Sequence, residues 1–349
     1  MTQPLSTPAL VVDLDIFESN LAAMEDLLDG TGKALRPHVK THRTPELARR
    51  QLGGAARGVT CATVGEAEAM VAAGIADVLI ANEVVAEDKL ARVAALGHDA
   101  TVTVAADDPE AVRALGRTAQ KTGSTVGVLV DVDVLLHRCG VASIPEAVAL
   151  ADVIVHTRGV RFAGVMGYEG RVRMGTDDRD VRLARAYGVL RETRDSLVQA
   201  GHDVQWVSAA GTSTLREAIA DPTITEIQAG VYALMEPQLM DGGLPFRCAT
   251  VVRGTVISRH PGRAIVDVGR RVVGLEYGPP IPVGLTTDGV AMSDEHATLT
   301  MADPPPLGSL IDFIPGQIRT TFNLHDRVWV SRGGSVVDCW PVAARGSSQ

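Results

Sequence analysis

Strand-like and helix-like segments alternate through most of this chain, and no other feature of the sequence constrains the fold more strongly. The strand-like segments are apolar runs rich in Val, Ile and Ala, as expected of parallel strands that are buried on both faces. Eight strands that alternate with helices predict a (β/α)8 TIM-type barrel, an α/β fold, rather than an open sheet. The expected strands are residues 34–40, 58–64, 77–83, 99–106, 125–134, 161–168, 204–210 and 225–229.

Segments rich in Ala, Leu, Arg and Glu lie between these strands and predict the barrel helices. Pro45, Pro109 and Pro145 stand near the helix starts, where proline is tolerated because the first turn does not need its missing N–H. An additional strand at 9–15 and a helix at 16–28 precede the barrel. The expected barrel helices are residues 45–52, 65–73, 86–96, 109–122, 145–155 and 179–200.

The pattern changes near Phe246. Between residues 249 and 342, short Val- and Ile-rich stretches are separated by turns that contain Gly and Pro, and helical periodicity is weak. We therefore predict two domains: a barrel over residues 1–245 and an antiparallel β domain over residues 246–349. The expected strands of the second domain are residues 250–258, 264–268, 328–330 and 336–340.

The charge and the cysteines limit the classes of function. A net charge of -9 argues against a nucleic-acid partner. Charged or polar residues interrupt every apolar run before it reaches membrane-spanning length, and residues 1–8 lack the basic start and apolar core of a signal peptide. Cys61, Cys139, Cys248 and Cys339 form no Cys-x-x-Cys pair and no disulfide framework, which predicts a reducing, cytoplasmic location.

Lys40 ends the first strand-like run of the predicted barrel. In parallel barrels the catalytic side chains project from the carboxyl ends of the strands. A lysine at that rim can be partly desolvated, which favours its neutral amine and makes it competent for Schiff-base formation. On the local sequence alone, an ordinary surface lysine is an equally good interpretation.

Two loops further along the chain have the composition of phosphate-binding loops. Gly211, Thr212 and Ser213 follow the seventh strand, and Gly230 and Tyr232 follow the eighth. Small, glycine-containing loops offer backbone N–H groups and hydroxyls to a phosphate, and barrels commonly bind phosphate after strands seven and eight. Each loop alone is more often structural. Together with a lysine on the same rim, the two loops predict pyridoxal 5′-phosphate as the cofactor.

Short motifs along nearly the whole chain, in order and at suitable spacing, carry a resemblance to a known family. They are residues 7–13, 38–42, 138–141, 168–170, 211–213, 230–232, 323–326 and 340–346. The chain resembles the D-threonine aldolase / D-serine dehydratase-like family, whose barrel is of the alanine racemase type, fold type III among pyridoxal-phosphate enzymes. The resemblance implies that Lys40 is the cofactor lysine, that Arg138 and Tyr168 contact the cofactor, and that the protein is a homodimer.

The chain departs from this family where a divalent metal is bound. The family carries His-x-Asp or His-x-Cys shortly before the motif at 323–326, whereas this chain has Gln317 and Arg319. Gln is a poor ligand for a transition metal, and Arg cannot ligate one because it stays protonated. Arg171 also stands where related aldolases often carry histidine. We therefore predict no metal, and we expect Arg171, Gln317 and Arg319 to bind substrate.

The remaining candidates leave alternative roles open. His42 can act as an acid/base or can be a satisfied rim histidine, and Arg138 can bind the cofactor or form a salt bridge. Tyr168 and Arg319 complete the candidate catalytic set of Lys40 and His42, while Glu169 is a weaker candidate. Asp131, on the fifth strand, is expected to cap a helix rather than to catalyse.

Three functions are compatible with this sequence. The resemblance favours a lyase, an aldolase or dehydratase, that acts on a β-hydroxy-D-amino acid. The replaced metal ligands favour, as the main alternative, a metal-independent amino-acid racemase or epimerase. A non-catalytic pyridoxal-phosphate carrier is the third alternative, and the second domain argues against it because single-barrel carriers lack one.

Overall fold

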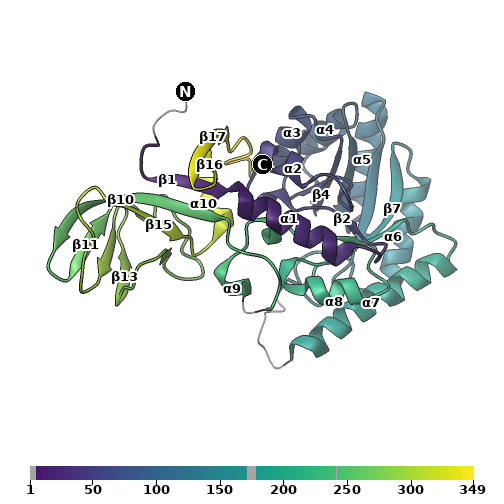
Figure 1. The fold of residues 1–349 in the computed structure, drawn as a ribbon. Coiled ribbons are helices and arrows are strands. Elements are labelled where there is room, and N and C mark those ends of the chain that lie inside the picture. The colour runs from purple at the N-terminus through teal and green to yellow at the C-terminus, as the bar shows by residue number, and fades with distance from the viewer. Residues whose placement is uncertain (1–4, 171–177, 241) are drawn as a thin grey trace. The chain divides into compact units, whose positions relative to one another are not determined.

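The computed structural model describes residues 5–170, 178–240 and 242–349. The chain forms two compact units (Figure 1). The barrel unit comprises Glu25–Lys40, Ala48–Gly230 and Ser347–Gln349. The β unit comprises Met1–Met24, Thr41–Leu47 and Val231–Gly346.

Among the described residues, eight parallel strands form the sheet of the barrel unit in the order β2-β9-β8-β7-β6-β5-β4-β3. Single bridges from Leu35 to Ala56 and from His38 to Thr60 join the two ends of this sheet, so that the strands close into a barrel. The predicted (β/α)8 fold is confirmed. The strands are β2 (Ala34–Leu35), β3 (Val59–Cys61), β4 (Asp77–Glu83), β5 (Thr101–Ala106), β6 (Val126–Asp131), β7 (Val160–Met166), β8 (Trp206–Ala209) and β9 (Glu226–Ile227).

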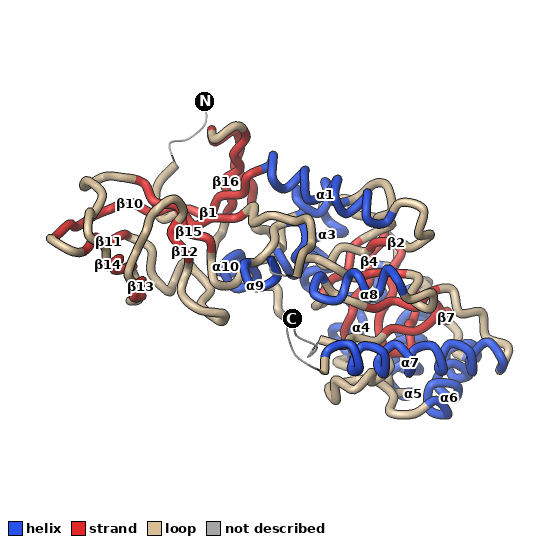
Figure 2. Tube along the Cα trace, turned by 60° about the horizontal axis from the view of Figure 1, so that its bottom comes forward, coloured by secondary structure: helices blue, strands red, loops and turns tan. Residues whose placement is uncertain are grey.

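Helices with polar caps surround this sheet (Figure 2). Thr63, Asp108 and Ser143 each accept a hydrogen bond from a backbone N–H in the first turn of the following helix, and Pro109 and Pro145 lie in the first turns of theirs. The helices are α2 (Pro45–Gln51), α3 (Val64–Ala72), α4 (Glu87–Leu96), α5 (Pro109–Thr122), α6 (Ile144–His156), α7 (Arg179–Gln199) and α8 (Leu215–Ala220).

The first strand of the chain belongs to the sheet of the β unit. β1 (Ala9–Asp13) pairs antiparallel with β10 (Thr250–His260) and parallel with β16 (Arg327–Arg332). All the other strand pairs of this unit are antiparallel among the described residues, so the predicted C-terminal antiparallel β domain is confirmed. The remaining elements are β11 (Arg263–Val266), β12 (Ile281–Pro282), β13 (Gly289–Met292), β14 (Ala297–Thr300), β15 (Leu310–Ile314), β17 (Ser335–Pro341), α1 (Leu14–Leu28), α9 (Pro237–Met240) and α10 (Ile318–Leu324).

The first barrel strand is shorter than the sequence predicts. Strand β2 ends at Leu35, and Lys40 lies in a 3-10 helix, η1 (Val39–Thr41). Pro37 interrupts the strand because it has no N–H to donate to a ladder. Lys40 nevertheless follows the carboxyl end of a barrel strand, which is the position that its proposed chemistry requires.

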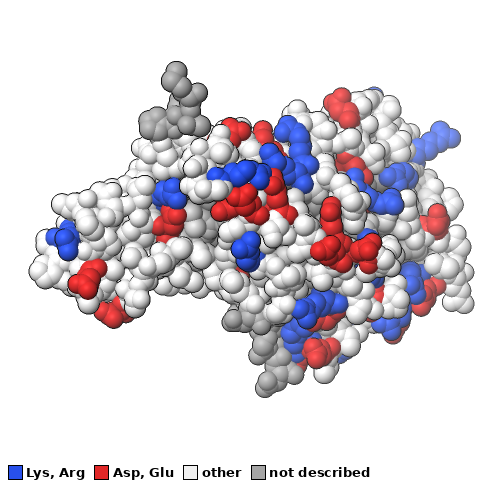
Figure 3. Space-filling model, viewed as in Figure 1, with Lys and Arg blue, Asp and Glu red and all other residues white. Residues whose placement is uncertain are grey.

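The surface carries charges of both signs. On the face shown in Figure 3, basic and acidic side chains are interspersed, and neither sign covers a continuous area. That face therefore offers no broad positive surface to the phosphates of a nucleic acid. Within the described ranges, no helix is both long enough and apolar enough to cross a lipid bilayer.

Candidate active site

The ring of Tyr168 is the centre of a cluster at the carboxyl ends of the barrel strands. The Nζ atom of Lys40 lies 5.8 Å from the ring centroid, and the Cζ atom of Arg138 lies 6.0 Å from it. Gly211 lies beside the same ring, since a Cβ atom at this position would be 3.6 Å from it. The barrel thus brings together four predicted site residues, which follow β2, β6, β7 and β8.

A buried carboxylate holds the loop that follows β8. Glu169 accepts a hydrogen bond from the hydroxyl of Thr214 and another, of 3.3 Å, from that of Tyr187. Thr214 in turn accepts a hydrogen bond of 3.2 Å from the backbone N–H of Gly211. Burial raises the pKa of Glu169, although these hydrogen bonds oppose the rise. The Oε2 atom of Glu169 is buried and has no hydrogen-bond partner among the described residues.

The backbone of the same loop is constrained at both ends. Ala210 has a φ of 69°, in the left-handed region, which costs a residue with a Cβ roughly 1–3 kcal/mol. The carbonyl of Ser213 accepts a hydrogen bond of 2.7 Å from Arg179. Thr212 is buried, as is Gly230 after β9. Phosphate binding by these two loops stays a prediction.

Carboxylates also meet at the carboxyl ends of β4, β5 and β6. Asp131 is buried, and burial together with its hydrogen bond to Glu83 raises its pKa to about 8, while the charge of Arg138 opposes the rise. Asp107 accepts a hydrogen bond of 2.9 Å from the backbone N–H of Gly140. Asp131 therefore does not cap the next helix, contrary to the sequence-based expectation. The raised pKa favours the protonated form of Asp131, which can donate a hydrogen bond to Glu83.

His42 and Tyr232 are buried residues of the β unit. The Nδ1 atom of His42 accepts a hydrogen bond of 3.1 Å from the backbone N–H of Thr44, and its ring lies edge-on to Phe322, with 6.4 Å between the centroids. Tyr232 packs against Phe246, with 5.5 Å between the ring centroids. The surroundings of His42 favour the structural interpretation, and its role as an acid/base stays a prediction, as does cofactor contact by Tyr232.

Gln317 and Arg319 take part in a polar cluster of the β unit with Glu236, Glu276 and Tyr277, here called the Arg319 cluster. The Nη2 atom of Arg319 lies 3.8 Å from the Oε2 atom of Glu236 and donates a hydrogen bond of 3.2 Å to the hydroxyl of Tyr277. In the amide orientation that satisfies both its oxygen and its nitrogen, Gln317 donates a hydrogen bond to Glu276 and accepts one from Arg319, each over 3.3 Å. Burial raises the pKa of Glu236, and the charge of Arg319 opposes this. The Arg319 side chain is 30% exposed and can therefore meet a solute.

The ligand chemistry of this cluster does not suit a transition metal. A guanidinium stays protonated and repels a cation, and a glutamine supplies one neutral oxygen. No group of three or more His, Cys, Asp or Glu side chains within the described part of the chain could hold a metal ion. Arg171, the third candidate for substrate binding, lies outside the described residues. The metal-free expectation stays a prediction.

Comparison with known proteins places this site in a family. The model of the alanine racemase N-terminal domain matches residues 12–237, and the model of the putative serine dehydratase domain matches residues 249–331. The chain belongs to the alanine racemase N-terminal domain family, whose members are fold type III pyridoxal-phosphate enzymes.

Several relatives match nearly the whole length of the chain. A D-threonine aldolase from Arthrobacter sp. is 37% identical over 99% of this chain and 94% of its own length. A 3-hydroxy-D-aspartate aldolase from Paracoccus denitrificans is 32% identical over 98% of this chain and 92% of its own. The crystal structure of D-threonine aldolase from Filomicrobium marinum superposes with a TM-score of 0.93 at 37% identity, covering 99% of this chain and 97% of that one. These relatives support a lyase.

Pyridoxal 5′-phosphate is the cofactor of this family, and the Tyr168 cluster suits it. Lys40 supplies an amine for the aldehyde of the cofactor, and Arg138 supplies a guanidinium for its oxygen atoms. Gly211 leaves the space beside the Tyr168 ring free of a side chain. The residues present therefore fit the group.

Several residues around these clusters were not found from the sequence. Thr214 directly follows the predicted glycine loop, and this position is the signal that could have singled it out. Tyr187 lies within helix α7, and Glu236 lies beyond the last barrel strand. No sequence motif or periodicity singles out either position. Their roles become visible only through their hydrogen bonds to Glu169 and to the backbone N–H of Ile318, the latter of 3.0 Å.

Proposed function

We propose that this chain is a pyridoxal-phosphate-dependent lyase that acts on a β-hydroxy-D-amino acid, as an aldolase or dehydratase, without a divalent cation. The observation that carries the proposal is the Tyr168 cluster, with Lys40 and Arg138 at 5.8 and 6.0 Å from one ring. The activities of the full-length relatives, a D-threonine aldolase and a 3-hydroxy-D-aspartate aldolase, support the substrate class. The replaced ligands Gln317 and Arg319 support the independence from metal.

Each candidate site residue of the barrel unit has a distinct task in this proposal. Lys40 holds the cofactor covalently, and Arg138 binds an oxygen of the cofactor ring. Residues 211–213, with Gly230, bind the phosphate, and Glu169 positions that loop through Thr214. When bound, the cofactor withdraws electrons from Cα of an amino acid and so weakens the bonds at that carbon.

Arg319 binds the substrate in this proposal. Within the described residues, the hydrogen bonds of Arg319 come from its Nη2 atom, to Tyr277 and Gln317, so its other N–H donors are available for a carboxylate. A two-pronged contact between guanidinium and carboxylate is both strong and directional. Gln317 orients Arg319 by accepting a hydrogen bond from the Nη2 atom of Arg319.

The product decides between the lyases and the racemase. Holoenzyme is incubated with a strong chelator and a panel of D- and L-3-hydroxy amino acids in D2O. Glycine and an aldehyde identify an aldolase, and a 2-oxo acid with ammonia identifies a dehydratase. An α-deuterated amino acid with an intact carbon skeleton as the sole product overturns the proposal in favour of a racemase. The Lys40→Ala variant is the control for uncatalysed exchange.

The covalent attachment is tested separately. Borohydride reduction of the holoenzyme followed by peptide mapping is expected to find the cofactor on Lys40. A label on any other lysine contradicts the assignment of the Tyr168 cluster as the cofactor site.

We also propose that the protein is a cytoplasmic homodimer. The four cysteines are free thiols, which suits a reducing compartment. Ile257, Ile281 and Leu310 are about half exposed on β10, β12 and β15, and a second copy of the chain would cover such apolar side chains. Light scattering at working concentration tests this, and a fully active monomer would refute it.

A further inference from the structure

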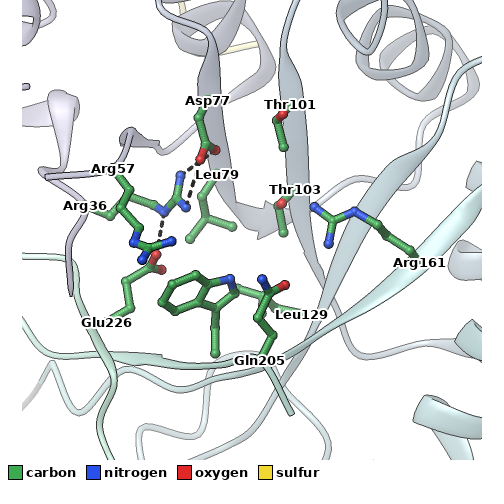
Figure 4. A pocket seen from close by; sticks show the side chains of 11 residues that line it. Arg36, Arg57, Asp77, Leu79, Thr101, Thr103, Leu129, Arg161, Gln205 and Glu226 are labelled. Atoms are coloured by element: carbon green, nitrogen blue, oxygen red, sulfur yellow. Dashed lines mark hydrogen bonds and ion pairs between the residues drawn. The ribbon is translucent and has the colours of Figure 1, made fainter. Parts of the chain in front are cut away.

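A cavity lies at the amino-terminal ends of the barrel strands, at the opposite ends of the strands from the Tyr168 cluster (Figure 4). Its volume is about 460 Å³, within the range of small-molecule sites. Its walls come from the first residues of β4, β5, β7, β8 and β9 and from the residues beside β2 and β3. The cavity therefore belongs entirely to the barrel unit.

Arg36 forms a closed network on one side of this cavity. Its buried guanidinium donates hydrogen bonds of 2.8 Å to Glu226 and 2.7 Å to Asp77, drawn as dashed lines in Figure 4. The hydroxyl of Ser208 donates a further bond of 2.6 Å to Glu226. Each of these three charges has a partner, so this network is structural and needs no ligand.

Two other arginines of the cavity wall, Arg57 and Arg161, are exposed and have no acidic partner among the described residues. The guanidinium of Arg57 lies over the indole of Trp206, 4.8 Å from the ring centroid. Arg161 points toward Thr103 (Figure 4). A Cβ at Gly127 would lie 3.3 Å from Nη2 of Arg161 and 2.6 Å from Oγ1 of Thr103, so glycine is what leaves this space open.

The floor of the cavity is apolar. Leu79 and Leu129 belong to the buried core of the barrel, and Trp206 packs against that core. The lining carries three arginines and two carboxylates, a net formal charge of 3 − 2 = +1. Unpaired guanidinium groups above an apolar floor complement an anion that has an apolar body.

We propose that this cavity is a binding site for a small organic carboxylate with an apolar or planar body. Arg57 and Arg161 bind the carboxylate, and Trp206 with the two leucines receives the apolar part. The proposal is independent of the proposed function, because none of these residues belongs to the Tyr168 or Arg319 clusters.

The strands that form the cavity also lead to the Tyr168 cluster. β7 runs from Val160, beside Arg161, to Met166, two residues before Tyr168. β8 runs from Trp206 to Ala209, two residues before Gly211. A carboxylate held at the starts of these strands would contact the same elements that carry the cofactor residues at their other ends. By linkage, if the bound carboxylate changes the affinity for the cofactor, the cofactor changes the affinity for the carboxylate by the same factor.

Calorimetric titration of the holoenzyme with benzoate tests the proposal, since benzoate is a carboxylate on an apolar ring. Inorganic phosphate and benzyl alcohol are the comparison probes, each lacking one half of that chemistry. We expect benzoate to bind at one site per chain and more tightly than either comparison probe. Arg161→Gln and Arg57→Gln should each weaken benzoate by on the order of tenfold or more, because a charged hydrogen bond is lost.

Three further variants keep the result interpretable. Arg259→Gln removes an equally exposed arginine of the β unit and should leave benzoate binding unchanged. Arg319→Gln removes the proposed substrate-binding arginine and should also leave it unchanged. Thr101→Glu adds a negative charge at the exposed start of β5 and should weaken benzoate binding while leaving both arginines in place. Cofactor absorbance and circular dichroism verify that each variant is folded.

Two results would overturn the proposal. One is the absence of a saturable benzoate signal in the wild-type holoenzyme. The other is benzoate affinity that falls in Arg319→Gln but not in Arg161→Gln, Arg57→Gln or Thr101→Glu, which would place the carboxylate at the substrate site instead. The lyase assay of the same preparations shows independently whether the proposed function holds.

Discussion

Replacing Asp131 by asparagine tests whether burial at the barrel rim keeps Asp131 protonated in the folded protein. Asp131 is 6% exposed and hydrogen-bonds Glu83. Burial is the main reason why its pKa rises to about 8, the hydrogen bond and charge of Glu83 and the charge of Asp107 add to the rise, and Arg138 opposes it. The folded protein therefore keeps a proton that the unfolded chain loses.

The sign of the effect on stability follows from this difference. Because the folded pKa lies above the unfolded one, the contribution of Asp131 is fully present below the unfolded pKa and is lost as the pH rises through the folded pKa. One extra proton in the folded state makes the free energy of unfolding fall by about 1.4 kcal/mol per pH unit between the two. From about pH 5 to about pH 7.5, the unfolding free energy of Asp131→Asn should therefore rise relative to wild type by on the order of 3 kcal/mol.

Urea unfolding of wild type and variant, at constant ionic strength and with saturating cofactor, measures this difference at each pH. Asp133→Asn is the matched control. Hydrogen bonds from the backbone and ring of His137 lower the pKa of Asp133 despite its partial burial. The contribution of Asp133 to the free energy of unfolding is thus constant above the pKa of Asp133 in the unfolded chain. It is lost only as the pH falls through the pKa of Asp133 in the folded protein. A difference in unfolding free energy between wild type and Asp131→Asn that stays constant over this pH range would refute the raised pKa of Asp131.

Further predictions concern the loop and the Arg319 cluster. Thr214→Val removes the link between Glu169 and Gly211 and should weaken cofactor binding roughly tenfold or more, measured by titrating apoenzyme, whereas an unchanged affinity contradicts the positioning role. Arg319→Ala should raise KM for the substrate by on the order of tenfold, measured by steady-state kinetics, and an unchanged KM contradicts substrate binding. Activity should survive a strong chelator, and about one tightly bound divalent cation per chain whose removal stops turnover would contradict this. Gln317→His combined with Arg319→Asp should introduce metal-stimulated aldol cleavage, compared with and without manganese.

The barrel and its rim could be predicted because both follow from local pattern. Apolar runs with helical segments between them define parallel strands, and the closure of the barrel brings the carboxyl ends of all strands to one rim. Lys40, Tyr168 and Gly211 were therefore expected to meet even though they are far apart in the sequence. Pro37 shortened β2 without moving Lys40 away from that rim.

Other parts could not be predicted because they depend on pairings that leave no periodic signal. β1 pairs with β10 across more than 200 residues, and nothing in its apolar pattern distinguishes this from a barrel strand. Glu83 and Asp131 meet because β4 and β6 end at the same height on the rim, a matter of register rather than of composition. Helix α10 begins directly after Gln317 and contains Arg319. Its first turns include two threonines, which are weak helix formers, so the sequence pattern does not predict this helix.

The charges of the Arg319 cluster bear on which lyase reaction it serves. A divalent cation lowers the pKa of a bound hydroxyl and also stabilises a departing hydroxide. Arg319 performs both tasks less well than a divalent cation would, because its charge is delocalised and Glu236 lies 3.8 Å away. With Glu276 held through Gln317, the cluster holds two carboxyl groups and one guanidinium. Aldol cleavage requires a group that accepts the proton of the β-hydroxyl, whereas dehydration requires stabilisation of the leaving hydroxide. If Arg319 binds the substrate as proposed, the neighbouring carboxyl groups meet the first requirement and not the second, so the proposal favours cleavage of the Cα–Cβ bond over dehydration.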